Sequence, residues 1–196
     1  MCIINPAYWG YNLSDGWGTD VTGASDADLQ DYGAFLANRY DQGNVIWCMG
    51  GDYASTSGNR DKQWNIVTGI RSVRTTDLVT AHPDSSEDDP YAYWGGYTGF
   101  SLNNAYTYET SGDYVYEECA TAYGRSGPLP FIYFEGKYDG SDSATVAMLR
   151  RQSYGSILSG ACGQIYGNNP VWHFESSNWG ESYSGTWESN LTTTGA

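Results

Sequence analysis

The sequence is poor in basic side chains. Nine Lys and Arg residues stand against 23 Asp and Glu residues, which gives a formal net charge of −14. Such an excess of negative charge repels nucleic-acid phosphates and anionic lipid surfaces. Neither a nucleic acid nor a membrane is therefore an expected partner, and the expected ligands are neutral or cationic.

Histidine and cysteine are also scarce. The two histidines, His82 and His173, lie far apart and form no HExxH pattern. The four cysteines show neither CxxC pairing nor the spacing of metal ligands, and they are Cys2, Cys48, Cys119 and Cys162. We therefore expect no metal site and no cofactor, and we expect core thiols in preference to disulfides.

Long apolar runs and nucleotide-binding motifs are missing as well. No run approaches the roughly 18 apolar residues needed to span a bilayer, and no signal peptide is predicted in this chain. The absence of GxGxxG and of a P-loop argues against a nucleotide-binding sheet. Hydrophobic residues make up 40% of the chain and aromatic residues 16%, which is enough to form a hydrophobic core. We therefore expect one domain over residues 1–196. A composition with 18 Tyr and eight Trp residues is frequent among sugar-binding proteins.

Apolar segments and helical patterns alternate along the chain. Strands are predicted at the start of residues 1–10 and at 44–49, 78–81, 101–108, 131–134 and 161–166. A helix begins after the N-cap Ser25, and further helices are predicted at 61–74, 113–123 and 143–158. Loops are expected up to Gly23 and over 84–99. Because the strands lack polar alternation, they indicate a parallel sheet covered by helices.

Two architectures fit this pattern: an open doubly wound sheet and a (β/α)8 TIM barrel. The residues after the predicted strands favour the barrel, because catalytic and binding side chains gather at the carboxyl ends of its strands. The polar and aromatic strand ends are Tyr8, Trp9, Asp52, His82, Tyr108, Glu135, Tyr166 and Asn168. Such a barrel typically needs about 250 residues, so we expect a partial barrel that lacks about the first two β/α units.

Asp52 and Glu135 are the two carboxylates at these strand ends. Hydrolysis of a glycosidic bond needs an acid for the leaving oxygen and a second carboxylate that acts as nucleophile or activates water. The pattern therefore suggests a glycosidase. The plainer alternatives are that Asp52 caps the turn after Gly51 and that Glu135 is a solvated loop residue.

Three segments resemble successive motifs of the apiosidase-like family of TIM-barrel glycoside hydrolases. They are residues 44–52, 130–138 and 160–172, and the opening at residues 5–11 is similar too. The resemblance implies Asp52 as acid/base, Glu135 as nucleophile, a retaining reaction on a pectin-like polysaccharide, and a secreted or periplasmic protein. By the resemblance, His82, Tyr166 and Trp172 match positions that line the family's pocket. The other residues expected to bind substrate are Tyr8, Trp9, Tyr108, Tyr138 and Asn168.

The sequence departs from the family pattern at three places. Lys137 stands where the family usually has Arg, Gly136 where it often has Pro, and residues 106–108 differ from the usual polar sequence. Because of these departures, the resemblance does not identify which sugar is cleaved. Two other hypotheses also stay open, a non-catalytic carbohydrate-binding barrel and a truncated chain without activity, and the oligomeric state is open as well.

Overall fold

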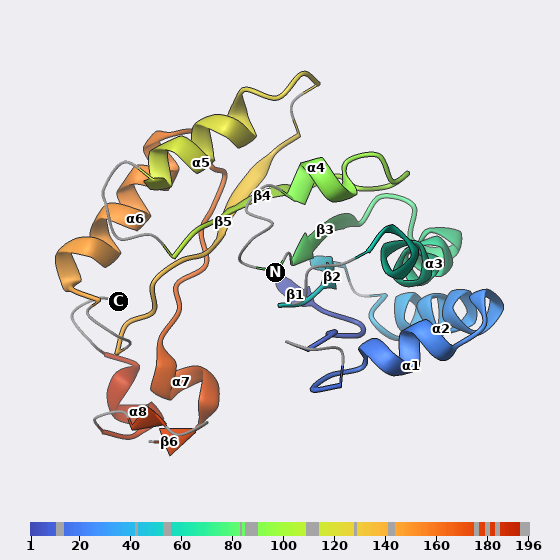
Figure 1. Cartoon of the computed structure of the whole chain (residues 1–196), viewed down its shortest axis with the longest axis horizontal. Helices are drawn as coiled ribbons and strands as arrows, with labels where there is room; N and C mark the ends of the chain where they lie inside the picture. The colour runs from blue at the N-terminus through green and yellow to red at the C-terminus, as the bar shows by residue number, and fades with distance from the viewer. Residues whose placement is uncertain are drawn as a thin grey trace. The chain divides into compact units, whose positions relative to one another are not determined.

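The computed structural model divides into two compact units, Met1–Asn104 and Ala105–Ala196 (Figure 1). The residues that it describes are 1–10, 14–41, 43–52, 56–82, 84, 90–108, 114–127, 129–140, 144–174, 177–178, 181–182 and 185–192. One domain over residues 1–196 stays a prediction.

A three-stranded parallel sheet forms the centre of the N-terminal unit. Its strands are β1 (Cys2–Ile4), β2 (Val45–Gly50) and β3 (Leu78–His82), in the order β1-β2-β3. Ile46 of β2 pairs with Ile3 of β1, and Trp47 pairs with Val79 of β3. All residues of β2 after Val45 are buried. The prediction of parallel, apolar strands is therefore confirmed in this unit.

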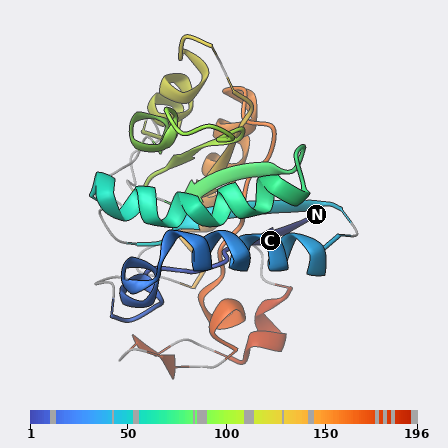
Figure 2. The same cartoon turned by 90° about the vertical axis from the view of Figure 1, so that its right-hand side faces the viewer.

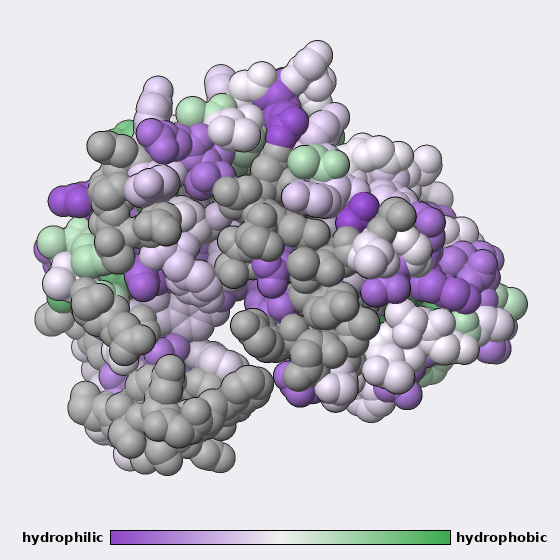
Figure 3. Space-filling view, viewed as in Figure 1, coloured by the Kyte–Doolittle hydropathy of each residue, from purple (hydrophilic) through white to green (hydrophobic). Residues whose placement is uncertain are grey.

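Two long helices, α2 (Asp26–Arg39) and α3 (Ser57–Val73), pack against each other and cover one face of this sheet (Figure 2). The Ser25 hydroxyl accepts a hydrogen bond of 3.1 Å from the Asp28 amide, so the predicted N-cap is confirmed. A Cβ atom at Gly69 would lie 1.9 Å from the carbonyl oxygen of Gln30, which shows how closely the two backbones approach. Hydrophilic residues are prominent on the visible surface of this unit (Figure 3).

Two short helices lie in segments predicted as loops. They are α1 (Gly18–Gly23) and α4 (Pro90–Trp94), so the loop predictions are wrong at these residues. Burial of aromatic side chains accounts for α4: the Trp94 indole is 1% exposed and lies 6.1 Å from the Trp9 ring and 5.7 Å from the Trp64 ring. A helix of five residues is too short for periodicity to reveal. Residues 11–13 and 85–89 of the predicted loops lie outside the described residues.

The C-terminal unit begins within β4 (Asn103–Tyr106), which pairs with β5 (Phe131–Glu135). Helices α5 (Tyr114–Tyr123) and α6 (Val146–Leu158) follow, as predicted. The side chains that form this core cluster are Ala105, Val115, Cys119, Ala122, Phe131, Tyr133 and Ala161. Apolar spacing in α6 suggests Tyr154 and Ile157 for its packed face, but both are exposed, whereas Gln152 and Ser156 are buried.

The segment predicted as the last strand, 161–166, forms no regular strand and has one isolated parallel bridge to β5. Tyr133 pairs with Gln164, and beyond β5 Asp139 pairs with Asn168. Four short elements follow that no periodicity predicted: α7 (Asn169–His173), β6 (Ser177–Asn178), β7 (Glu181–Ser182) and α8 (Trp187–Asn190). Strands β6 and β7 pair antiparallel. Among the residues described, no helix is long and apolar enough to cross a membrane.

Candidate functional site

Asp52 follows β2 after two glycines with left-handed backbone conformations. The φ angle is 90° at Gly50 and 137° at Gly51, values that residues with a side chain rarely adopt. A Cβ atom at Gly50 would lie 2.3 Å from the carbonyl oxygen of His82, and the Gly51 amide donates a 2.9 Å hydrogen bond to that same oxygen. The glycines therefore fix the backbone before Asp52 against the end of β3.

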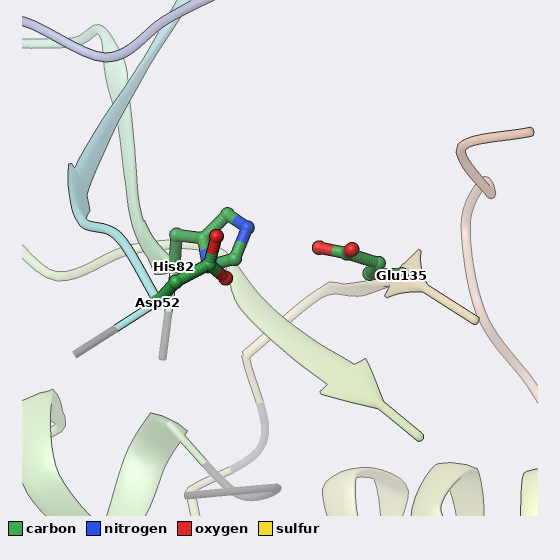
Figure 4. Close-up of side chains that lie close together, drawn as sticks. All are labelled: Asp52, His82 and Glu135. Carbon is green, nitrogen blue, oxygen red and sulfur yellow. The ribbon is translucent and has the colours of Figure 1, made fainter. Parts of the chain in front are cut away.

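The Asp52 carboxylate lies between two predicted site residues of the N-terminal unit. The Tyr8 hydroxyl donates a hydrogen bond to Oδ2, and Nδ1 of His82 lies 3.8 Å from Oδ1. The latter distance is too long for a hydrogen bond but allows an ion pair when the imidazole is protonated. Figure 4 shows the imidazole beside the carboxylate. The Asp52 side chain is 37% exposed, so a ligand has access to it.

A buried amide that the sequence analysis missed connects the two loops that carry these residues. Gln63 is fully buried; its Oε1 accepts a 2.6 Å bond from the Gly50 amide, and its Nε2 donates a 2.9 Å bond to the Ala7 carbonyl. Gln63 shares a helical stripe with Ile66 and Ile70, and a polar residue on an apolar stripe was the available signal. This side chain thereby joins the segment before Tyr8 to the segment before Asp52.

Trp9, predicted to contact substrate, lies in the core. Its side chain is fully buried, and its ring packs beside that of Trp94. Stacking on a sugar would need the indole to become exposed, so this prediction gains no support from the structure.

Glu135 is the last residue of β5 (Figure 4). It is buried, with 8% of its surface exposed. Its Oε1 accepts hydrogen bonds from two phenols, those of Tyr108 and Tyr138, the second at 2.7 Å. Two donors on one oxygen favour the ionised carboxylate and fix its orientation. Tyr108 and Tyr138 were predicted to bind substrate, and the structure places both on the predicted nucleophile.

Burial and charge keep the Tyr108 phenol protonated. Burial raises its pKa far above the ordinary value of 10.0, and the neighbouring Glu135 charge raises it further. Burial likewise raises the pKa of Tyr133, whose hydroxyl donates a 3.1 Å bond to the Thr107 carbonyl. The Thr107 amide in turn donates to the Glu135 carbonyl at 3.1 Å. The segment that carries Tyr108 is thus tied to the strand end that carries Glu135.

The departures at residues 136 and 137 have structural correlates. A Cβ atom at Gly136 would lie 2.2 Å from the Tyr133 hydroxyl oxygen, so no larger residue fits without movement there. The Lys137 ammonium lies 5.9 Å from the centre of the Tyr108 ring, within reach of a cation–π interaction. Gly136 thus leaves room for the Tyr133 hydroxyl, and Lys137 lies beside the ring of Tyr108, whose hydroxyl donates to Glu135.

The C-terminal unit contains a cavity of about 380 Å³ that brings together four predicted substrate-binding residues. These are Tyr138, Tyr166, Asn168 and Trp172. The Trp172 side chain is 53% exposed, which suits an aromatic platform for a sugar ring. The Tyr166 hydroxyl donates a 2.6 Å bond to Asp139, which fixes that ring.

Asn168 has a structural role in this cavity. Its Oδ1 accepts a bond from the Val171 amide as N-cap of α7, and its Nδ2 donates to the Asn190 carbonyl at 3.4 Å. Asn190 and Leu191, at the end of α8, also line the cavity. Neither residue was predicted, because both lie at the end of a short helix without a periodic signal.

Comparison with known proteins identifies the family. The family model described as "Apiosidase-like, catalytic domain" matches residues 1–196. The chain belongs to this family. The resemblance drawn from the sequence motifs is therefore confirmed. A comparison with curated proteins finds no match.

Solved structures with a similar fold are glycoside hydrolases. A glycoside hydrolase family 5 protein from Bacteroides vulgatus matches with a TM-score of 0.74 and 21% identity, over 95% of this chain and 43% of that protein. A second structure, titled "Glycoside hydrolase", matches with a TM-score of 0.73 and 22% identity, over 89% of this chain and 46% of that protein. The catalytic domain of Thermobifida fusca endoglucanase Cel5A matches with a TM-score of 0.53 and 14% identity, over 82% of this chain and 54% of that domain. The chain thus spans less than half of the first two, and its fold is a mixed α/β fold with parallel strands.

Proposed function

We propose that the protein is a glycoside hydrolase that cleaves O-glycosidic bonds in a complex, pectin-like polysaccharide, with Asp52 as acid/base and Glu135 as nucleophile. Membership of the apiosidase-like family supports the reaction class. The observation that carries the proposal is the environment of Glu135, a buried carboxylate at a strand end that accepts two phenolic hydrogen bonds on one oxygen. A solvated loop residue would have no such environment.

The proposed reaction retains the anomeric configuration and has two steps. First, a carboxylate oxygen of Glu135 attacks the anomeric carbon while Asp52, in its acid form, gives its proton to the leaving glycosidic oxygen. Second, Asp52 as base takes a proton from water, the water oxygen attacks the anomeric carbon, and the bond to Glu135 breaks. Tyr108 and Tyr138 hold Glu135 for both steps.

The sugar is proposed to contact the cavity lined by Tyr138, Tyr166 and Trp172. Aromatic faces stack against the apolar face of a sugar ring, and the exposed Trp172 indole offers the largest such surface in this cavity. Because the protein has a formal net charge of −14, the sugar in this cavity is proposed to be a neutral residue of the polysaccharide and not one of its uronic acids.

The test is hydrolysis of apiose-containing pectin fragments by the wild type and by Glu135→Gln and Asp52→Asn. Both changes should reduce kcat at least about 10³-fold, since each removes a group that takes part in bond cleavage. Azide should restore cleavage in Glu135→Gln or Asp52→Asn where it takes the place of the carboxylate that the variant lacks. NMR of the first product released by the wild type should show retention of the anomeric configuration. Unchanged release of reducing sugar by Glu135→Gln would contradict the assignment.

A non-catalytic carbohydrate-binding protein is the second candidate, and the aromatic cavity favours it as much as the first. Turnover separates the two. Under this alternative the wild type binds pectin fragments without releasing sugar, and Glu135→Gln binds them equally well. Under the leading proposal the wild type cleaves them.

A further inference from the structure

The N-terminal unit contains a second cavity, of about 460 Å³, between α1 and α2. This volume lies within the range of roughly 300–1,000 Å³ that is typical of small-molecule sites. Its floor consists of buried apolar side chains, among them Val21, Leu29 and Ile66, none more than 5% exposed. None of the proposed catalytic or substrate-binding residues lines it.

Two aromatic side chains form walls of this cavity. Trp17 is 62% exposed and Tyr32 is 39% exposed, so each ring presents a surface to a ligand. The Tyr32 hydroxyl donates a 2.8 Å hydrogen bond to the Pro6 carbonyl, and burial raises the pKa of this phenol. The Tyr32 ring is therefore fixed and uncharged.

Two carboxylates, those of Asp20 and Asp28, also line the cavity. Within the described part of the chain, Asp20 makes no side-chain hydrogen bond or ion pair, whereas Asp28 accepts a 2.6 Å bond from the Ser25 hydroxyl. Lys62 does not neutralise them, because its ammonium binds Asp26 at 2.7 Å and the Ala24 carbonyl at 2.8 Å. The cavity therefore combines an apolar floor with two aromatic rings and two negative charges.

We propose that this cavity binds an organic cation with an apolar body, such as a quaternary or alkyl ammonium group. Trp and Tyr faces attract such cations through their π electrons, and nearby carboxylates add Coulomb attraction. The apolar floor takes the methyl or methylene groups. This site is independent of glycoside cleavage and adds a second ligand to the protein.

Choline and its neutral isostere 3,3-dimethylbutan-1-ol are the matched probes, since they share a shape and differ in charge. Calorimetric titration at low ionic strength should show choline binding about tenfold more tightly than the isostere, and added salt should weaken only choline. Equal affinities would overturn the proposal in favour of an apolar site. Tighter binding of glucose than of choline, or no binding of choline, would overturn it too.

Variants connect the binding to the cavity. Asp20→Asn and Trp17→Ala should each weaken choline binding at least about fivefold, because each removes one attractive group from an exposed position. Asp31→Asn is the matched control, since Asp31 is an exposed acid on α2 that does not line the cavity. A loss in Asp31→Asn equal to that in Asp20→Asn would show diffuse attraction to an acidic protein and overturn the proposal. Glu135→Gln should bind choline like the wild type, which separates this test from the proposed catalysis.

Discussion

The Tyr138 hydroxyl donates a 2.7 Å hydrogen bond to Oε1 of Glu135, three residues earlier in the chain. The loop after β5 therefore returns to hold the side chain with which β5 ends. The residue that positions the Glu135 carboxylate thus comes from the short segment directly after the strand. Tyr138 also lines the cavity beside Trp172.

We expect Tyr138→Phe to lower kcat by about 10- to 100-fold with a smaller change in KM, because one charge-assisted hydrogen bond is worth roughly 1.5–3 kcal/mol. The fold should be unaffected, since the ring remains. Steady-state kinetics on pectin fragments measure this. Tyr123→Phe is the control, because Tyr123 is 66% exposed and should tolerate the change. A rise in KM with kcat unchanged would mean that Tyr138 serves only to bind substrate.

Gln63→Leu should destabilise the N-terminal unit by about 1–3 kcal/mol, because it leaves the Gly50 amide and the Ala7 carbonyl without the partner that each has now. It should also reduce activity through displacement of Asp52. Denaturant unfolding measures the first effect. Gln30→Leu is the comparison, since Gln30 is half-buried and, within the described part of the chain, its side chain bonds only that of Asn65. Equal effects of the two variants would count against a special role for Gln63.

Gly69→Ala should destabilise the protein by about 1–3 kcal/mol or more, since the new methyl group would overlap the Gln30 carbonyl and force α2 and α3 apart. Gly58→Ala makes the same change in the same helix, where nothing lies within 4 Å of the new atom. Its better helix propensity should leave stability unchanged or raised by up to about 1 kcal/mol. Opposite shifts in Tm are the expected result. Equal shifts would show that the space between α2 and α3 accommodates the added methyl group at residue 69 without loss of stability.

The sequence predicted the elements that carry the two proposed catalytic acids. Apolar runs without alternation indicated β2 and β5, and the abrupt change to glycine or a carboxylate marked their ends near Asp52 and Glu135. Ser25 marked the start of α2 because an N-cap is a local interaction between residues close in sequence. Local signals therefore sufficed wherever the cause was local.

Features that depend on contacts between distant segments were not predictable in this way. In α6 the buried side chains are Leu149, Gln152 and Ser156, whereas the apolar Tyr154 and Ile157 are exposed. Two of the three buried residues are polar, so the apolar periodicity of the sequence did not identify the packed face of this helix. The bond from Tyr108 to Glu135 likewise joins residues 27 positions apart and depends on loop geometry.

Cys119 should resist alkylation in the native protein. Burial raises its pKa from the ordinary 9.0 to about 12, so at pH 8 only about one thiol in 10⁴ is the reactive thiolate, against about one in ten for an ordinary thiol. Cys2 and Cys162 are exposed, and Cys48 is buried like Cys119. Iodoacetamide at pH 8 followed by peptide mass spectrometry should therefore modify Cys2 and Cys162 first, and all four cysteines in denaturant. Modification of native Cys119 as fast as Cys162 would show that the helix α5 opens readily and that its core packing is weaker than the structure implies.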